Sequence, residues 1–235
     1  MAATVVPHDP APITATLICD ERVTSGNGTR RVSLLVSGAV DAAVLVPVKS
    51  FHAAKRRLAE WLSPADRERL ARWMAERVLA AAAPLPVFVA CDDDRVAEWA
   101  EAHGAQVSWG PGLGLNGAID HGVDTMAGKG IDHVVVAHGD LPLATTLADL
   151  ARPGHVVIAP DRRRDGTNVL SRPTDLTIRA EYGAGSFVRH LSAALSSGAP
   201  VSVRRDARLA IDVDTIADCR HPDVAPLLRH AGIVL

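Results

Sequence analysis

The chain has 235 residues, a formal net charge of −2 at pH 7 and three widely separated cysteines. Its length suits one large α/β domain, and its 48% hydrophobic content allows a full core without disulfide bonds. The sequence contains no long Lys/Arg block, CxxC pair or 18-residue apolar span, and its first 30 residues lack a basic start followed by an apolar core. We therefore expect a reduced, cytoplasmic protein with no nucleic-acid partner, structural zinc or membrane segment.

The first 42 residues differ from the rest of the chain. Two β-rich runs, at 13–20 and 30–37, are separated by Ser-Gly-Asn-Gly, which is a hairpin signal. The regular pattern of apolar runs begins only near Ala42. We therefore predict an N-terminal extension over 1–42 with a possible β-hairpin, followed by one domain over 43–235.

From residue 42 onward, predicted strands alternate with predicted helices. Short apolar runs predict strands at 42–48, 86–90, 105–109, 133–138, 155–159 and 201–204, and apolar residues three and four apart predict helices at 64–83, 94–103, 117–127, 185–197 and 222–230, with a short one near 145–151. This order predicts an α/β fold with a mostly parallel central sheet and helices on both faces. Ligands of such sheets bind beyond the carboxyl ends of the strands.

The first predicted strand runs into Lys49, Lys55, Arg56 and Arg57 within nine residues. Basic residues around a helix start often form only a solvated surface. Cations are nevertheless unfavourable near a helix N-terminus, where the backbone dipole is already positive. A bound phosphate chain would reconcile the two. Lys49, Lys55 and Arg57 are therefore the candidate catalytic cations.

A glycine-rich run follows the third predicted strand. Gly112-x-Gly114-x-x-Gly117 precedes a helix, with Asp140 23 residues beyond Gly117, which matches the dinucleotide fingerprint and makes an NAD(P)-binding oxidoreductase a rival. The fingerprint normally follows the first strand of its unit, however, and two strand–helix units precede it here. Asn116 suits either a helix N-cap or an amide offered to a nucleobase. Gly114 and Asn116 are the nucleotide-binding candidates.

Carboxylates stand at the ends of later predicted strands. Asp140 ends the run VVVAHGD and is followed by Leu-Pro, while Asp212 and Asp214 alternate in LAIDVDTIAD and on a strand would share one face. Three such acids repel one another unless a cation lies between them, and oxygen ligands without Cys or His suit Mg²⁺. The alternative is that each aspartate only caps the helix that follows. We expect Asp140, Asp212 and Asp214 to bind Mg²⁺.

Two polar segments, 161–170 and 181–187, resemble an ordinary turn and an ordinary helix entry. Thr167, the Gly183 amide and Ser186 in them are also suited to holding a small phosphorylated acid. None of the ten histidines has a convincing partner by spacing, so we assign them to core or surface. HExxH, GxSxG and GxxxxGK[ST] do not occur, which removes the main support for zinc peptidases, serine hydrolases and P-loop enzymes.

The order of these motifs carries a resemblance. "PVK" with "AKRRL", then "GLN-A", "GDLP", "DGTNVL", "YGAGSF" and "DVDT-AD" together resemble the CofC/FbiD family of phospholactate or phosphoenolpyruvate guanylyltransferases, which serve deazaflavin coenzyme F-420 biosynthesis. The matching motifs lie between residues 43 and 225. The extension over 1–42 has no counterpart in the family core, and Tyr182 stands where Phe is usual.

The resemblance implies a single nucleotidyltransferase domain over 43–235, with a nucleotide-diphospho-sugar-transferase-like fold. It implies that two metal-binding aspartates match Asp140 and Asp212, and that contacts to the acceptor acid match Thr167, Gly183 and Ser186. It also implies transfer of GMP from GTP to a small phosphorylated carboxylic acid, with Mg²⁺ and release of pyrophosphate. The choice of guanine rests on the resemblance alone.

Several alternatives stay open at this point. Phosphoenolpyruvate is favoured as the acceptor, because the Ala-rich, Arg-rich composition is typical of bacteria with high genomic G+C content and bacterial members often use it. 2-Phospholactate and 3-phosphoglycerate are the other candidates. A homodimer is an open expectation, since the extension could supply oligomer contacts. The rival functions are the oxidoreductase and a non-catalytic nucleotide-binding module.

Overall fold

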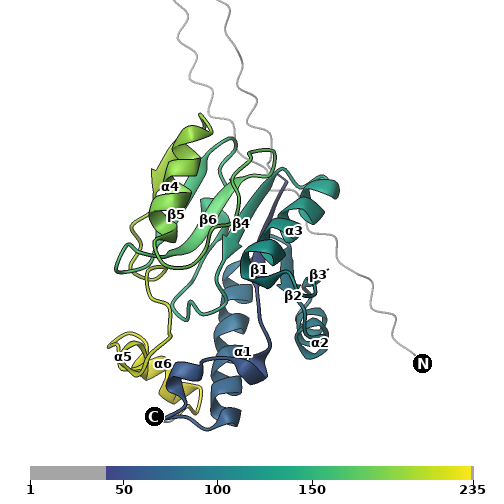
Figure 1. Cartoon of the computed structure of the whole chain (residues 1–235). Helices are drawn as coiled ribbons and strands as arrows, with labels where there is room; N and C mark the ends of the chain where they lie inside the picture. Colours follow the sequence, from purple (N-terminus) through teal and green to yellow (C-terminus); the bar gives the residue numbers. More distant parts are fainter. Residues whose placement is uncertain (1–40, 234–235) are drawn as a thin grey trace, which may run out of the picture. The chain divides into compact units, whose positions relative to one another are not determined.

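A seven-stranded sheet with the order β3-β2-β1-β4-β6-β5-β7 organises the molecule (Figure 1). The computed structural model describes residues 41–233, so the predicted hairpin at 13–20 and 30–37 lies outside the described residues. The strands are β1 (Ala42–Pro47), β2 (Val87–Cys91), β3 (Gln106–Trp109), β4 (His133–Ala137), β5 (Val156–Pro160), β6 (Thr167–Pro173) and β7 (Val201–Val203).

The sheet is mostly parallel, as predicted. Strands β3, β2, β1 and β4 run parallel to one another, and β5 runs parallel to β7, whereas β6 is antiparallel to both β4 and β5. The interpretation of 161–170 as a loop holds for 161–166 and was wrong from Thr167 onward, where β6 begins. All seven residues of β6 are buried, so the strand does not alternate between buried and exposed positions. Its polar residues also interrupt any continuous apolar run, so neither pattern of a strand is visible in the sequence.

Within residues 41–233, six α-helices and three short 3₁₀ helices lie between or after the strands. The α-helices are α1 (Pro64–Ala81), α2 (Asp94–Ala102), α3 (Gly114–Gly128), α4 (Ser186–Ser196), α5 (Ile216–Cys219) and α6 (Ala225–His230); the 3₁₀ helices are η1 (Phe51–Ala53), η2 (Arg56–Leu58) and η3 (Ala148–Leu150). The basic segment after β1 therefore contains two 3₁₀ turns rather than the helix start we expected. The helix expected near 145–151 is also only a 3₁₀ turn, and the last helix starts at Ala225 rather than at 222.

The helices cover both faces of the sheet. Figure 1 shows α3 and α4 in front of the strands and α1 behind them. In β1, Val44 and Val46 belong to the core cluster that includes α1 and α2, whereas Leu45 belongs to the cluster that includes α3, as the alternation of side chains along a strand requires. A Cβ added at Gly122 of α3 would lie 2.8 Å from Leu45 Cδ2, so a glycine is needed there for this close contact. The contact holds α3 firmly against β1.

A third core cluster fixes the C-terminal segment at the carboxyl end of the parallel strands. Leu58 of η2 and Met74 of α1 pack with Val213, Cys219 of α5 and Leu228 of α6. The segment before α5 thereby crosses the end of β4. Within residues 41–233, no helix has the length and apolar character needed to cross a membrane.

Candidate active site

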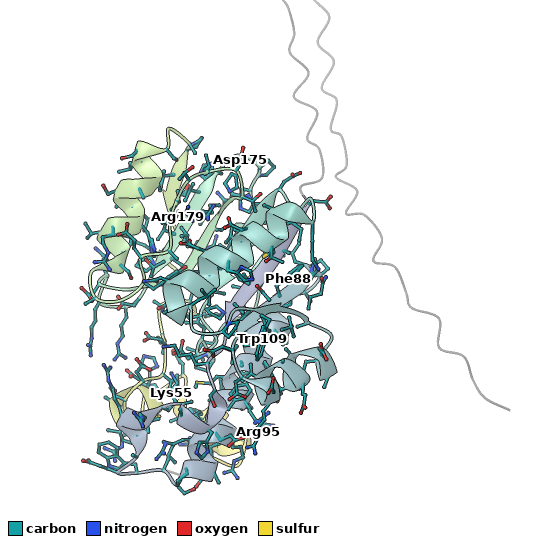
Figure 2. The ribbon with its side chains drawn as sticks, turned by 45° about the vertical axis from the view of Figure 1, so that its right-hand side comes forward. Lys55, Phe88, Arg95, Trp109, Asp175 and Arg179 are labelled. Atoms are coloured by element: carbon teal, nitrogen blue, oxygen red, sulfur yellow. The ribbon has the colours of Figure 1, made fainter. Side chains whose placement is uncertain are left out.

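Three charged side chains from distant parts of the sequence meet at this end of the sheet. Lys55 Nζ lies 2.6 Å from Asp140 Oδ2 and 2.9 Å from Asp214 Oδ1. Lys55 precedes η2 in the left-handed region, at φ 53°, which is unusual for a residue with a side chain. Figure 2 shows Lys55 at the end of the molecule where the C-terminal helices lie. The three residues form an ion-pair cluster, with Lys55 between the two acids, at the carboxyl edge of the sheet.

Backbone contacts bring the two acidic segments together. Asp140 follows β4 in a tight turn, and its carbonyl oxygen accepts a hydrogen bond of 3.2 Å from the Val213 N–H. The carbonyl oxygen of Pro142, two residues further on, accepts from Arg77 Nε of α1. Residues 210–214 form no strand, so the expectation that Asp212 and Asp214 share one strand face was wrong. Tertiary contacts, rather than strand periodicity, place both acids near Asp140.

The charges in the cluster are strongly coupled. Burial opposes ionisation of Asp140, but the adjacent Lys55 ammonium outweighs it and holds the pKa of this carboxyl below its usual value. Burial likewise opposes the charge on Lys55, yet Asp140 and Asp214 keep its pKa above the usual value. Burial and then the Asp140 charge raise the pKa of Asp212 to about 6. Lys55 thus supplies the positive charge that the predicted acids require, and Asp212 is the least compensated of them.

The donor set fits Mg²⁺ only in part. Asp140 Oδ1 is buried and has no hydrogen-bond partner among the described residues, which is unusual for a carboxylate oxygen and suits it to bind a cation. In the region 41–233, however, no three His, Cys, Asp or Glu side chains are gathered closely enough to hold a metal ion by themselves. Mg²⁺ commonly binds one or two carboxylates and completes its shell with water and phosphate oxygens. Asp140 with Asp212 or Asp214 fits that manner of binding.

A cavity of about 420 Å³ opens beside the cluster. Lys49, Lys55 and Arg57 contribute to its wall, together with Asp140 and Asp214. Arg57 is exposed, and its Nη1 lies 3.7 Å from Asp214 Oδ2. The structure therefore brings the three predicted catalytic cations and two of the three predicted metal ligands to one cavity. Asp212 lines a small neighbouring cavity of about 70 Å³, together with Arg57 and Asp214.

The two nucleotide-binding candidates differ in their surroundings. Gly114 is the first residue of α3, has φ +64° and lines a further cavity next to the first. Asn116 is not an N-cap, because that position belongs to Leu113. Its Oδ1 accepts a hydrogen bond of 2.8 Å from the Tyr182 N–H, and its Nδ2 donates to the Tyr182 carbonyl oxygen at 3.3 Å. In this structure the Asn116 amide therefore links α3 to the loop before α4.

The predicted acceptor residues lie on the other side of Asp140. The pairing of Ala137 with Val169 in β4 and β6 puts Thr167, the first residue of β6, at the carboxyl edge of β4. A register shift against β5 at this point accompanies a change in the direction of the side chains: Val169 packs in the cluster under α1, whereas Thr167 Oγ1 lies 3.0 Å from His190 Nδ1 of α4. The Thr167 N–H donates to Ser186 Oγ at 3.0 Å.

Two of the three predicted acceptor residues are buried, whereas the third lies in an exposed loop beside them. Thr167 and Ser186 are 2% and 1% exposed, whereas Gly183 is exposed and has φ +121°, a conformation that favours glycine. The structure brings Thr167 and Ser186 into direct contact and places the Gly183 loop immediately before α4.

Sequence reasoning missed the histidines of this region. His190 Nε2 accepts a hydrogen bond of 3.0 Å from the Glu181 N–H, and its ring lies 4.7 Å from that of Tyr182. His138, two residues before Asp140, also lies against Tyr182, with 4.9 Å between ring centroids. These contacts join β4, the loop before α4 and α4 itself. No spacing along the sequence could have signalled them, because each partner comes from a different element.

Comparisons with known proteins point to one family. The family model "Guanylyl transferase CofC like" matches residues 42–221. A phosphoenolpyruvate guanylyltransferase of Sphaerobacter thermophilus is 37% identical over 74% of this chain and 88% of its own length, and a 2-phospho-L-lactate guanylyltransferase of Methanothermobacter thermautotrophicus is 34% identical over 74% and 80%.

Solved structures confirm the predicted fold class. A putative nucleotide-diphospho-sugar transferase from Desulfovibrio desulfuricans has a TM-score of 0.62 at 18% identity, covering 83% of this chain and 96% of that one. A nucleotidyl transferase from Methanothermobacter has a TM-score of 0.56 at 16% identity, covering 81% and 97%. With the family model matched across the whole sheet and both sides of the site, the chain belongs to the CofC-like guanylyl transferase family and is a nucleotidyltransferase.

Proposed function

We propose that this enzyme transfers GMP from GTP to phosphoenolpyruvate, with Mg²⁺ and release of pyrophosphate, as a step in deazaflavin coenzyme F-420 biosynthesis. The observation that carries the proposal is the Lys55–Asp140–Asp214 cluster beside the cavity of about 420 Å³ at the carboxyl edge of the sheet. A phosphate oxygen of the acid attacks the α-phosphorus of GTP, and the bond from that phosphorus to the pyrophosphate oxygen breaks. The proposal places the reaction in the cytoplasm, where GTP and phosphorylated acids are available.

The residues of the cluster supply positioning and charge compensation. A triphosphate brings several negative charges, and Lys49, Lys55 and Arg57 line the cavity where those charges would lie. Phosphoryl and nucleotidyl transfer need little covalent chemistry from a protein, so orientation and charge compensation dominate. Bound Mg²⁺ would polarise the α-phosphate, held by Asp140 together with Asp212 or Asp214.

The acceptor acid is assigned to the side of Thr167, Gly183 and Ser186. Thr167 and Ser186 lie beyond the end of β4, so an acid held there approaches Asp140 from the opposite side to the cations of the first cavity. Phosphoenolpyruvate is preferred because the relative from Sphaerobacter is named for it, and 2-phospholactate is the second candidate because the archaeal relative is named for that acid. A pocket built around a hydroxyl would separate the two strongly.

The oxidoreductase reading has weaker support. The glycine run that resembles a dinucleotide fingerprint follows β3, which is the edge strand of the sheet, rather than the central β1. Thermal shift separates the two readings, since a ligand at 100 times its Kd stabilises a protein by about 2.7 kcal/mol. We expect GTP with Mg²⁺ to raise the melting temperature and NADH to leave it unchanged.

The deciding experiment incubates the enzyme with GTP, Mg²⁺ and one of phosphoenolpyruvate, 2-phospholactate or 3-phosphoglycerate, followed by mass detection of the guanylylated acid and a pyrophosphate assay. Parallel reactions with EDTA test the metal requirement. We expect most product from phosphoenolpyruvate and none with EDTA. A clear preference for another acid would overturn the choice of acceptor, and no product from any acid would overturn the transferase proposal.

A further inference from the structure

A second cavity, of about 320 Å³, adjoins the one beside Lys55. The two cavities share five wall residues: Pro47, Val48, Lys49, Ala53 and Leu115. A ligand whose phosphates lie near Lys49 can therefore extend into the second cavity without leaving the carboxyl edge of the sheet.

The order of the strands identifies which part of the reactants this second cavity would take. Its wall includes Ala90 and Asp92 at the end of β2 and Gly110 after β3, so it lies on the β1–β2–β3 side of Asp140. The predicted acceptor residues lie on the opposite side, at β6 and α4. The second cavity is thus next to the predicted triphosphate position and away from the acceptor, where the nucleoside part of GTP would extend.

The wall is suited to a flat heterocycle. Ala90, Leu115 and Ala118 present small or aliphatic side chains, and Gly110 and Gly114 allow close approach of the backbone. A Cβ at Gly110 would lie 2.9 Å from Leu113 Cδ1, so a larger residue there would displace Leu113. The apolar surface offers contact area to any base but does not discriminate between bases.

Asp92 is the one acidic residue in the wall of this cavity, within the described part of the chain. The neighbouring Asp93 is committed to capping α2, because its Oδ1 accepts the N–H groups of Arg95 and Val96 at 3.0 and 3.2 Å. A hydrogen bond with Ser50 further lowers the pKa of Asp93, ahead of the opposing effect of burial. Asp92 is exposed and takes no part in that cap.

We propose that the Asp92 carboxylate selects guanine by accepting hydrogen bonds from the ring N1–H and the exocyclic amine; this rests on the proposed function. Guanine presents two adjacent donors on this edge, and an ionised carboxylate is an acceptor only. Adenine and cytosine place a ring-nitrogen acceptor beside their amine, which would face a carboxylate oxygen unfavourably. A site built around such hydrogen bonds rejects bases that cannot form them.

The test replaces the carboxylate with an amide. The Asn side chain in Asp92→Asn can donate to the C2 carbonyl oxygen of xanthine, so we expect kcat/KM for GTP to fall at least tenfold and kcat/KM for xanthosine triphosphate to rise at least tenfold. Asp94→Asn is the matched control, since it makes the same charge change two residues away and Asp94 does not line the cavity. That variant should keep the wild-type GTP preference.

A second variant checks the amine contact separately. Inosine triphosphate lacks the exocyclic amine, so the wild type should prefer GTP over it, whereas Asp92→Ala should use both nucleotides about equally. An unchanged ratio of GTP to xanthosine triphosphate in Asp92→Asn, or an unchanged ratio of GTP to inosine triphosphate in Asp92→Ala, would overturn the proposal. Failure of the proposed function looks different, because the wild type itself would then form no guanylylated product.

Discussion

The two sides of Asp140 are built in different ways. On one side, Lys55, Asp140 and Asp214 form a charged cluster at turns and loop segments, open to a cavity. On the other side, Thr167, Ser186 and His190 form an uncharged hydrogen-bonded network between the start of β6 and the first half of α4. The charged side depends on mutual compensation among its own residues, and a ligand with its own charges can rearrange it. The uncharged side is held together by hydrogen bonds between its own neutral groups, so its arrangement does not depend on charge compensation.

The protonation state of His190 determines which groups on the Thr167–Ser186 side are left to donate hydrogen bonds. The Glu181 N–H can only donate, so His190 Nε2 must be the unprotonated nitrogen, and Nδ1–H then donates to Thr167 Oγ1. Burial is the main reason that the pKa of His190 falls to about 4, helped by the nearby charge of Arg189. Thr167 and Ser186 each already accept a hydrogen bond, so both hydroxyl protons are left to donate. Donors are what an anionic acceptor requires.

The largest expected effect comes from removing the central charge. Asp140→Asn should lower guanylyl transfer by roughly 10²- to 10³-fold, the typical loss when one preorganised electrostatic group is removed. Lys55 keeps its contact with Asp214, so the fold should persist, as circular dichroism and thermal melting would show. Asp175→Asn is the control, because Figure 2 shows Asp175 at the opposite end of the molecule from Lys55. Near-normal pyrophosphate release by purified Asp140→Asn would contradict the metal assignment.

The second prediction tests the uncharged side through pH. The pKa of His190 is lowered from 6.5 to about 4, mainly by burial, so the folded state stays neutral while the unfolded chain takes up a proton. The stability that this group contributes is complete above about pH 6.5 and is lost as pH falls towards 4, by at most about 3 kcal/mol. His133, whose pKa burial also lowers to about 4, acts in the same direction. Asp212, with its pKa raised to about 6, opposes both.

These contributions can be separated by measuring the free energy of unfolding in urea at pH 7.5, 5.5 and 4.5 for the wild type and for variants. His190→Asn should lose less unfolding free energy across this range than the wild type, because one group that resists protonation is gone. His52→Asn, at an exposed position, should follow the wild type. Identical pH profiles for His190→Asn and the wild type would show that His190 is not held neutral in the folded state.

The third prediction concerns the compensation between charges. Lys55→Met leaves Asp140 and Asp214 facing each other, and we expect a loss of about 2 kcal/mol of unfolding free energy in the absence of nucleotide and metal. The value lies below that of a fully buried pair because the Asp214 side chain is 43% exposed and is screened by solvent. Adding Asp214→Asn to Lys55→Met should restore much of that stability without restoring turnover. Denaturant titration and the product assay measure the two properties, and additive losses in the double variant would exclude the coupling.

The smallest effects are expected for single hydroxyl groups on the acceptor side. Thr167→Val removes the acceptor of the His190 Nδ1–H, and Ser186→Ala removes the acceptor of the Thr167 N–H. Each should raise KM for the phosphorylated acid by about tenfold, the scale of one hydrogen bond, while KM for GTP changes little. Thr125→Val on α3 makes the same chemical change away from the site. An equal rise in both KM values would show that these residues act only through the fold.

The sequence alone was enough to place most of the regular structure. β1 to β5 and α1 to α4 follow from apolar runs and helical periodicity, because those elements bury an aliphatic face against the sheet or its covering helices. The start of α1 has local features too, since the Ser63 side chain accepts the Asp66 N–H and Pro64 is the first helical residue. Asp140 was placed correctly at the end of a buried strand for the same reason.

Only the tertiary structure decided the contacts between polar groups. β6 carries Asn168 and Ser171 into the interior, where their hydrogen-bond partners are the carbonyl oxygens of Leu209 and Leu150. Lys55 lies between two acids that follow it by 85 and 159 residues. A buried polar side chain is stable only when a partner is present, and these partners come from distant segments, so no local pattern could announce them. Burial of apolar side chains produces a periodic pattern in the sequence. Whether a buried polar group finds a hydrogen-bond partner depends instead on which segments the fold brings together.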